Sequence, residues 1–100
     1  MATTSKVLAR TAASTSNATL YTTPSATTTI VTNIVVANTA ASDATFDLSL
    51  DGVQVFNDAA IAANTTVFFD LKQALAATDL IEGSASAVTV NFHISGVEIS

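Results

Sequence analysis

Cysteine and tryptophan are absent from this sequence, and proline, histidine, methionine and tyrosine each occur once. Without cysteine the chain can form no disulfide, no thiolate nucleophile and no cysteine-ligated metal site. No segment approaches the ~20 consecutive apolar residues of a membrane helix, and the N-terminus has no apolar run of signal-peptide length. We therefore expect no membrane partner.

Charged residues are also scarce, at 11% of the chain, and the net charge is −5. Lys6 and Arg10 precede all eight carboxylates, so residues 1–42 carry a charge of +2. Residues 43–100 carry −7, because Lys72 stands alone against the eight carboxylates. A nucleic-acid-binding surface needs clustered lysine and arginine to neutralise phosphates. We therefore expect no nucleic-acid partner.

The composition instead favours strands, because threonine, valine and isoleucine fit a pleated surface and lose rotamer freedom in a helix. Apolar residues reach 49% of the chain, but many are alanine, and only five phenylalanines and one tyrosine add aromatic bulk. A chain of 100 residues builds a single core. We expect one all-β domain whose thin core gains stability from self-association.

The N-terminal segment differs from the rest in its high content of alanine, serine and threonine. Only Val7 and Leu8 are sizeable apolar residues between positions 2 and 18, too few to offset the entropy of ordering the segment. The sequence therefore predicts an extended arm over residues 1–18, ordered only against neighbouring chains, and a β-sandwich domain over residues 19–100. The arm residues expected to contact a partner are Lys6, Val7, Leu8 and Arg10.

A run of β-branched residues, Thr28–Asn38, follows the turn signal at Pro24. Both faces of this run are apolar, so it is expected to be a central and deeply buried strand. The predicted faces carry Ile30, Ile34 and Val36 on one side and Val31, Val35 and Ala37 on the other.

The clearest local pattern is a hairpin around Asp51-Gly52, a dipeptide typical of two-residue turns. Residues flanking such a turn pair directly, so Leu50 should face Val53, and Leu48 should face Val55. The residues expected on one inward face are Phe46, Leu48, Leu50, Val53 and Val55.

Further strands are predicted over Thr65–Leu71 and Val88–Ile99, with a bulge at Gly96, where the apolar alternation changes phase. The residues Leu71–Ala77 have helical propensity, but they suffice only for a helical turn between strands. About seven short strands result, the pattern of a single small antiparallel β-sandwich or barrel.

Catalytic candidates are weak. His93, the only histidine, shares a predicted polar face with Ser95, and Asp47 could complete a Ser-His-Asp group. No nucleophile-elbow motif accompanies them, so an interface or solvated histidine is the preferred interpretation. We expect no enzyme, no catalytic residues and no cofactor.

Asp43, Asp47, Asp51 and Asp58 lack the dense ligand spacing of a calcium loop, so no metal site is expected, and a cation at a subunit contact stays an open alternative. Phe56 and Phe68 are predicted to point outward, where each is either covered by a loop or packed on another subunit. Both are counted among the residues expected to bind a partner.

Three segments, LYTTPSATTTIVTNIVVANTAASDATFDLSLDG, IAANTTVFFDL and VTVNFHISGVEI, resemble small virion proteins of tailed bacteriophages. The resemblance covers about residues 19–99 and runs from a Leu-Tyr-Thr-x-Pro opening to a Ser-Gly-x-Glu-Ile ending. It implies a β-sandwich located in the virion, a capsid decoration or cement protein, often trimeric, with the major capsid protein or another virion protein as partner. Neck, collar, tail-fibre and baseplate proteins are the alternatives, and a sugar-binding module is a remote one because exposed aromatic residues are scarce.

Overall fold

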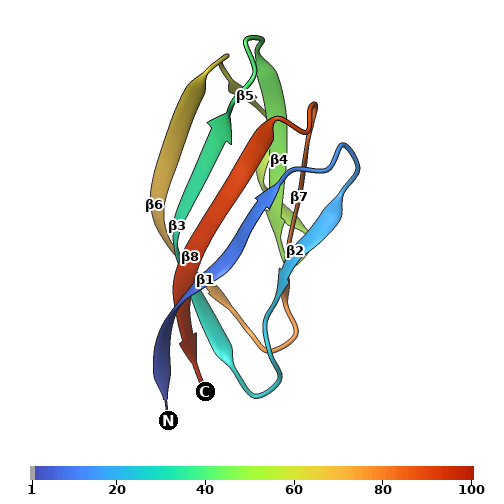
Figure 1. Cartoon of the computed structure of the whole chain (residues 1–100). Coiled ribbons are helices and arrows are strands. Elements are labelled where there is room, and N and C mark those ends of the chain that lie inside the picture. Colours follow the sequence, from blue (N-terminus) through green and yellow to red (C-terminus); the bar gives the residue numbers. More distant parts are fainter. Residues whose placement is uncertain (1) are drawn as a thin grey trace.

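Eight antiparallel strands form two four-stranded sheets in the computed structural model, which describes residues 2–100. The strands are β1 (Thr3–Ala12), β2 (Ala18–Thr22), β3 (Thr28–Asn38), β4 (Ala44–Leu50), β5 (Val53–Ile61), β6 (Thr65–Leu75), β7 (Leu80–Ala85) and β8 (Val90–Ile99). The first sheet has the order β1-β8-β3-β6, and the second has the order β2-β7-β4-β5 (Figure 1). The all-β sandwich expected from the sequence is thereby confirmed.

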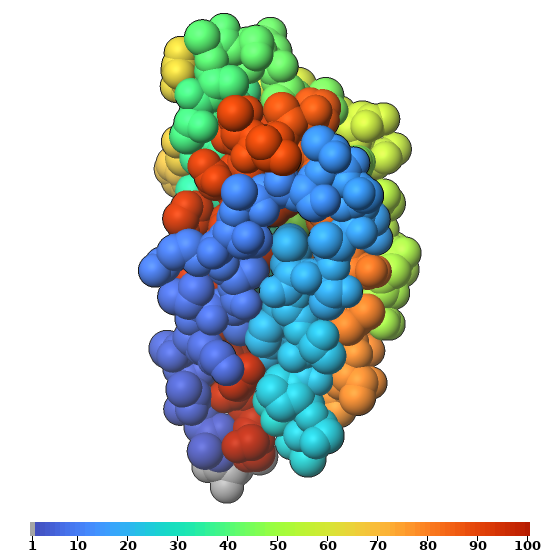
Figure 2. All heavy atoms as spheres, turned by 45° about the vertical axis from the view of Figure 1, so that its right-hand side comes forward, coloured from blue at the N-terminus to red at the C-terminus, as the bar shows by residue number. Residues whose placement is uncertain are grey.

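The N-terminal segment is the main difference from the sequence prediction. Residues Thr3–Ala12 are not a separate arm but the edge strand β1, which pairs with β8 from Thr3 opposite Ile99 to Ala12 opposite Asn91. Leu8 is 7% exposed. Figure 2 shows β1 lying beside β2 along one side of the molecule. Backbone pairing explains the difference, because it stabilises an edge strand that buries few side chains of its own.

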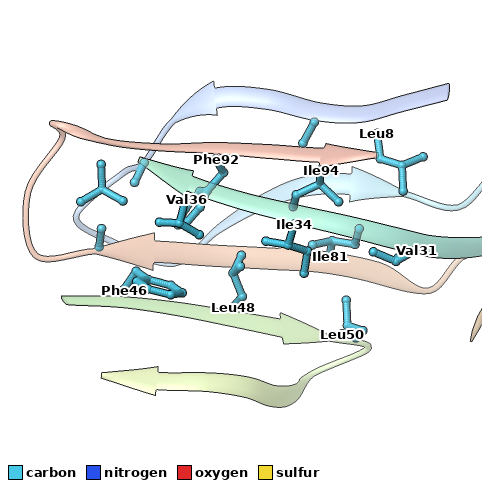
Figure 3. Packing of buried hydrophobic residues seen from close by; sticks show 14 of the residues in the cluster. Leu8, Val31, Ile34, Val36, Phe46, Leu48, Leu50, Ile81, Phe92 and Ile94 are labelled. Carbon is cyan, nitrogen blue, oxygen red and sulfur yellow. The ribbon is translucent and has the colours of Figure 1, made fainter. Parts of the chain in front are cut away.

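The core lies between the two sheets and is assembled from the inward positions of their strands (Figure 3). Phe46 of β4 packs edge-on against Phe92 of β8, with ring centroids 6.2 Å apart. Such aromatic pairs contribute roughly 0.5–1.5 kcal/mol beyond the burial of their area. The largest fully buried aliphatic side chains come from both sheets and are Ile34, Leu48, Ile61, Leu75, Ile81 and Ile94.

The predicted strand Thr28–Asn38 is confirmed as β3, between β8 and β6 in the first sheet. Its predicted faces need one correction. The register shifts at Thr32, so Val31 faces inward with Ile34 and Val36, whereas Ile30 falls on the other face. A single extra residue in a strand reverses the alternation beyond it.

The hairpin of β4 and β5 turns at Asp51 and Gly52, whose φ angles of 52° and 78° fit a type I′ turn. Leu50 pairs with Val53, as predicted. Beyond the next pair, Ser49 with Gln54, the register shifts, and Leu48 lies opposite Phe56 instead of Val55. The shift moves Val55 off the predicted inward face, and Val55 is exposed. Val53 keeps its predicted pairing with Leu50 but is 70% exposed, so the expectation that it is buried is wrong as well.

We expect Gly52→Val to lower the melting temperature by about 4–8 °C. A Cβ atom at position 52 would meet no other atom within 4 Å, so the penalty of about 1 kcal/mol comes from the positive φ alone. Thermal unfolding followed by circular dichroism measures the shift. Asp51→Asn is the matched control, because asparagine tolerates a positive φ; equal melting temperatures for both variants would contradict the turn assignment.

Two further predictions are corrected. Leu71–Ala77 forms no helical turn, because β6 continues to Leu75 in pairing with β3, and this pairing overrides the local helical propensity. The predicted bulge at Gly96 is also wrong: β8 alternates regularly through Gly96. The register shifts occur in its neighbours, at Leu8 of β1 and Thr32 of β3.

One buried side chain, Asn38 at the end of β3, connects the loops at the end of the sandwich away from the termini (Figure 1). Its Nδ2 donates to the carbonyl oxygens of Ser42, Ile61 and Ala62 at 2.8, 3.4 and 3.3 Å. Its Oδ1 accepts from the Ala40 backbone N–H at 3.1 Å and from the Thr89 hydroxyl at 3.3 Å. These hydrogen bonds satisfy a buried amide and fix three loops to the sheets.

Candidate functional site

The outer face of the first sheet carries the most distinctive surface of the described residues. Arg10 of β1 pairs with His93 of β8, His93 with Val35 of β3, and Val35 with Phe68 of β6. These four residues form a row across all four strands, which we call the cross-strand row. Phe68 is 69% exposed at one end of the row, and Arg10 is exposed at the other.

The outer face also carries apolar side chains away from this row. Val7 of β1 is exposed on the same face, whereas Ile30 and Val97 are half-buried on it. A shallow hollow of about 300 Å³ lies at the β1 end, where Arg10 and His93 meet Asn91. The face thus presents an aromatic ring, a guanidinium group and an imidazole. Aromatic residues and arginine are enriched at protein interfaces.

The structure brings together only three of the six predicted partner-binding residues. Val7, Arg10 and Phe68 share the outer face, but the side chain of Leu8 is buried in the core. Phe56 was expected to point outward and instead packs between the sheets, 5.3 Å from the Phe46 ring and 4.6 Å from the Phe69 ring. The bulge at Val55 explains this correction, because it reverses the alternation in β5.

Lys6, the remaining predicted residue, belongs to a polar network between the sheets. Its Nζ lies 3.3 Å from Glu98 Oε2. The Tyr21 hydroxyl donates a hydrogen bond to the same carboxylate and lies 2.8 Å from the Thr29 hydroxyl. Tyr21 belongs to β2 in the second sheet, and the other three belong to the first, so the network connects the two sheets.

The network shifts the ionisation of two of its members. The hydrogen bond from Tyr21 lowers the pKa of the Glu98 carboxyl below its ordinary value of 4.5, and Lys6 acts in the same direction against partial burial. Burial raises the pKa of the Tyr21 phenol above 10.0, and the hydrogen bond to Glu98 adds to this shift. Both shifts favour a neutral phenol donating to an ionised carboxylate.

These shifts predict a specific dependence of stability on pH. Because the pKa of Glu98 is lower in the folded state, its contribution is present above about 4.5 and is lost as the pH falls through the folded pKa. Tyr21→Phe should lower the urea midpoint at neutral pH and reduce the loss of stability on acidification. Urea unfolding at neutral pH and at about pH 3 measures both effects.

Glu98→Gln combined with Tyr21→Phe provides the control for this prediction. If the two residues act through their hydrogen bond, the double variant should lose little more stability than either single variant. An unchanged pH dependence in Tyr21→Phe would contradict the role of the phenol.

The remaining sequence candidates are not brought together. His93 and Ser95 lie on β8 of the first sheet, whereas Asp47 lies on β4 of the second and accepts from the Asp58 backbone N–H at 2.7 Å. No cluster of three or more histidine or acidic side chains suited to a metal ion occurs among residues 2–100. Within the same residues, no helix has the length and apolar character needed to cross a membrane.

The cross-strand row could not be predicted as a unit from the sequence. The alternation of the last strand placed His93 on a polar face, but the positions of Arg10 and Phe68 opposite its neighbours depend on the registers of four strands. No local signal in the sequence fixes those registers.

No family model and no curated protein matches the sequence. The fold is similar to that of a protein of the T13 IBDV viral particle, with a TM-score of 0.57 and 10% identity, over 97% of this chain and 30% of that chain. This chain therefore spans less than a third of that protein. The similarity shows that a viral particle protein contains this fold.

Two further solved structures are only loosely similar to this chain. A pentameric capsid protein isolated from metagenomic phage sequences matches with a TM-score of 0.40 and 19% identity, over 96% of this chain and 59% of that chain. The CBM35 from Paenibacillus barcinonensis matches with a TM-score of 0.41 and 11% identity, over the whole of both chains.

Proposed function

We propose that this chain is a structural protein of a bacteriophage virion, a decoration or cement subunit that binds the major capsid protein or another virion protein. The proposal assigns it no catalytic reaction and no cofactor. The observation that carries it is a contact between the two segments that begin and end the resemblance to phage virion proteins. Tyr21 of the first segment and Glu98 of the second are hydrogen-bonded in the network described above. Their hydrogen bond joins residues 77 positions apart.

This contact is relevant because a likeness in sequence does not by itself place the two segments side by side in the fold. Tyr21 comes from the Leu-Tyr-Thr-x-Pro opening and Glu98 from the Ser-Gly-x-Glu-Ile ending, on strands of different sheets. Gly96, in the same ending, lies against the Ile30 backbone, where a side chain would not fit. The resemblance therefore rests on residues with linked structural roles, as expected for a shared β-sandwich.

The outer face of the first sheet is the surface that we assign to the virion partner. Phe68 supplies an exposed aromatic anchor and Arg10 a planar cation, residue types enriched in interface centres. The guanidinium group of Arg10 is positively charged, so it would favour an acidic group on the partner. The likeness to a viral particle protein supports this role at the level of fold.

Binding to particles tests the proposal. Phe68→Ser should reduce the occupancy of the chain on purified virions of the phage that encodes it, about tenfold or more, because a buried aromatic anchor commonly contributes 2 kcal/mol or more. Val53→Ser is the matched control, since Val53 is equally exposed but belongs to the second sheet. Circular dichroism should show that both variants fold.

Mass spectrometry of purified particles decides between the possible locations. Many copies spread over the capsid support a decoration or cement protein, whereas a few copies at one vertex indicate a neck, collar, tail-fibre or baseplate protein. Absence of the chain from the particles overturns the proposal. Equal occupancy of Phe68→Ser and Val53→Ser would retain a virion role but remove the outer face as its binding surface. The trimer that the resemblance implies stays a prediction.

A further inference from the structure

The edge strand β6 is exposed along the side of the sandwich opposite β1. Among residues 2–100 its only strand partner is β3, so one row of its backbone N–H and C=O groups faces away from the sheet. A free edge of this kind can pair with another strand.

The surface on both sides of Leu71 in this edge is hollowed. A groove of about 430 Å³ runs between β6 and β5, lined by apolar groups that include Phe56, Phe69 and Leu71. A second hollow of about 470 Å³ lies beside Thr32, Asp70 and Lys72. Val53 and Val55 are exposed at the groove, so apolar surface is left uncovered there.

The charged residues of β6 indicate which strand could pair with this edge. Asp70 and Lys72 are both exposed on the outer side of β6, two positions apart, and Leu71 lies between them. Asp70 accepts one hydrogen bond, from Asn33 Nδ2 at 3.3 Å, and Lys72 has no ion-pair partner among residues 2–100. Charged residues on an edge strand normally oppose pairing with other strands.

A second copy of the same strand is an exception. When β6 pairs antiparallel with its own copy about a two-fold axis at Leu71, Asp70 lies opposite the partner's Lys72, and Lys72 lies opposite the partner's Asp70. Opposite charges in directly facing positions stabilise an antiparallel pair, whereas like charges destabilise it. A shift of the register would separate these charges.

We propose that two copies of this chain associate through antiparallel β6–β6 pairing centred on Leu71, which joins their first sheets into one eight-stranded sheet. The contact is isologous, so it closes as a dimer and leaves no free β6 edge. This assembly differs from the trimer that the phage resemblance implies, and it does not depend on the proposed capsid partner.

Charge reversal tests the pairing, with the mass of the full chain measured by sedimentation at micromolar concentration. Lys72→Asp and Asp70→Lys should each weaken the dimer by about tenfold or more, because each variant places two like-charged pairs across the two-fold axis. The double exchange Asp70→Lys with Lys72→Asp should restore the dimer. Asp58→Lys, exposed on β5 of the second sheet, is the matched control for charge reversal and should leave the mass unchanged.

Hydrogen exchange provides a second measurement. Dimer formation should protect the amides of residues 66–74 as the protein concentration rises, while β1 and β5 stay unchanged. A monomer or a trimer of the unaltered chain overturns the proposal. So does a double exchange that fails to restore the dimer, or protection that appears at β1 or β5 instead.

Discussion

Deletion of residues 2–12 is expected to abolish the folded state. The deletion removes β1 and exposes the whole length of β8 as a new edge. It also removes the Leu8 side chain from the core and Lys6 from the network around Glu98. A domain of this size has an unfolding free energy of only about 5–15 kcal/mol. The loss of one of eight strands is expected to remove most of that free energy. Circular dichroism and the dispersion of amide NMR signals would show the loss.

Two neighbouring substitutions separate this role of β1 from a general sensitivity of the N-terminus. Leu8 is 7% exposed and faces the core, whereas Val7 is 44% exposed on the outer face. Leu8→Asp should cost about 3–5 kcal/mol of unfolding free energy, because it buries an unpaired carboxylate, and Val7→Asp should cost less than about 1 kcal/mol. Normal folding of the deletion variant would instead support a dispensable arm.

Gly96→Ala is expected to destabilise the domain by about 3 kcal/mol. A Cβ atom at this position would lie far inside the contact distance of the Ile30 carbonyl oxygen and 2.9 Å from Leu8 Cδ1. The Leu8 side chain can move, but the Ile30 backbone is fixed by pairing with β8 and β6. Overpacking of this kind typically costs 1–3 kcal/mol, and here it would separate adjacent strands of the first sheet.

Urea unfolding measures the loss of stability in Gly96→Ala and in the control variant Gly52→Ala. At Gly52 the new methyl group meets open space and costs only the strain of a positive φ, about 1 kcal/mol. If the two variants lose equal stability, the close approach of β3 to Gly96 does not constrain the fold.

Features set by nearby residues were predictable from the sequence. The β-branched run Thr28–Asn38 gave a strand with the correct bounds, and Asp51-Gly52 gave the correct turn. In both cases the signal lies within a few residues of the structure that it specifies. The two-sheet architecture followed from the number and spacing of such signals.

Features that depend on distant pairing were not predictable. β1 looks like an arm because its stability comes from β8, whose pairing residues lie about 80–95 positions later in the chain. Phe56 was assigned to the outside because the bulge at Val55 leaves no mark in the local alternation. In the candidate site, the exposure of Phe68 was predicted, but its alignment with Arg10 needed the registers of four strands.

The pairing of the first strand with the last also governs when the chain can fold. Thr3 lies opposite Ile99, so the first sheet cannot be completed until residues 90–99 are available for pairing. Until then the apolar side chains of β3 lack β8 beside them, and the N-terminal residues have no partner strand. Closing so long a loop is entropically costly, and such non-local topologies fold on slow timescales, about milliseconds to seconds. Until β8 is in place these strand edges stay exposed, and exposed edges of this kind favour aggregation.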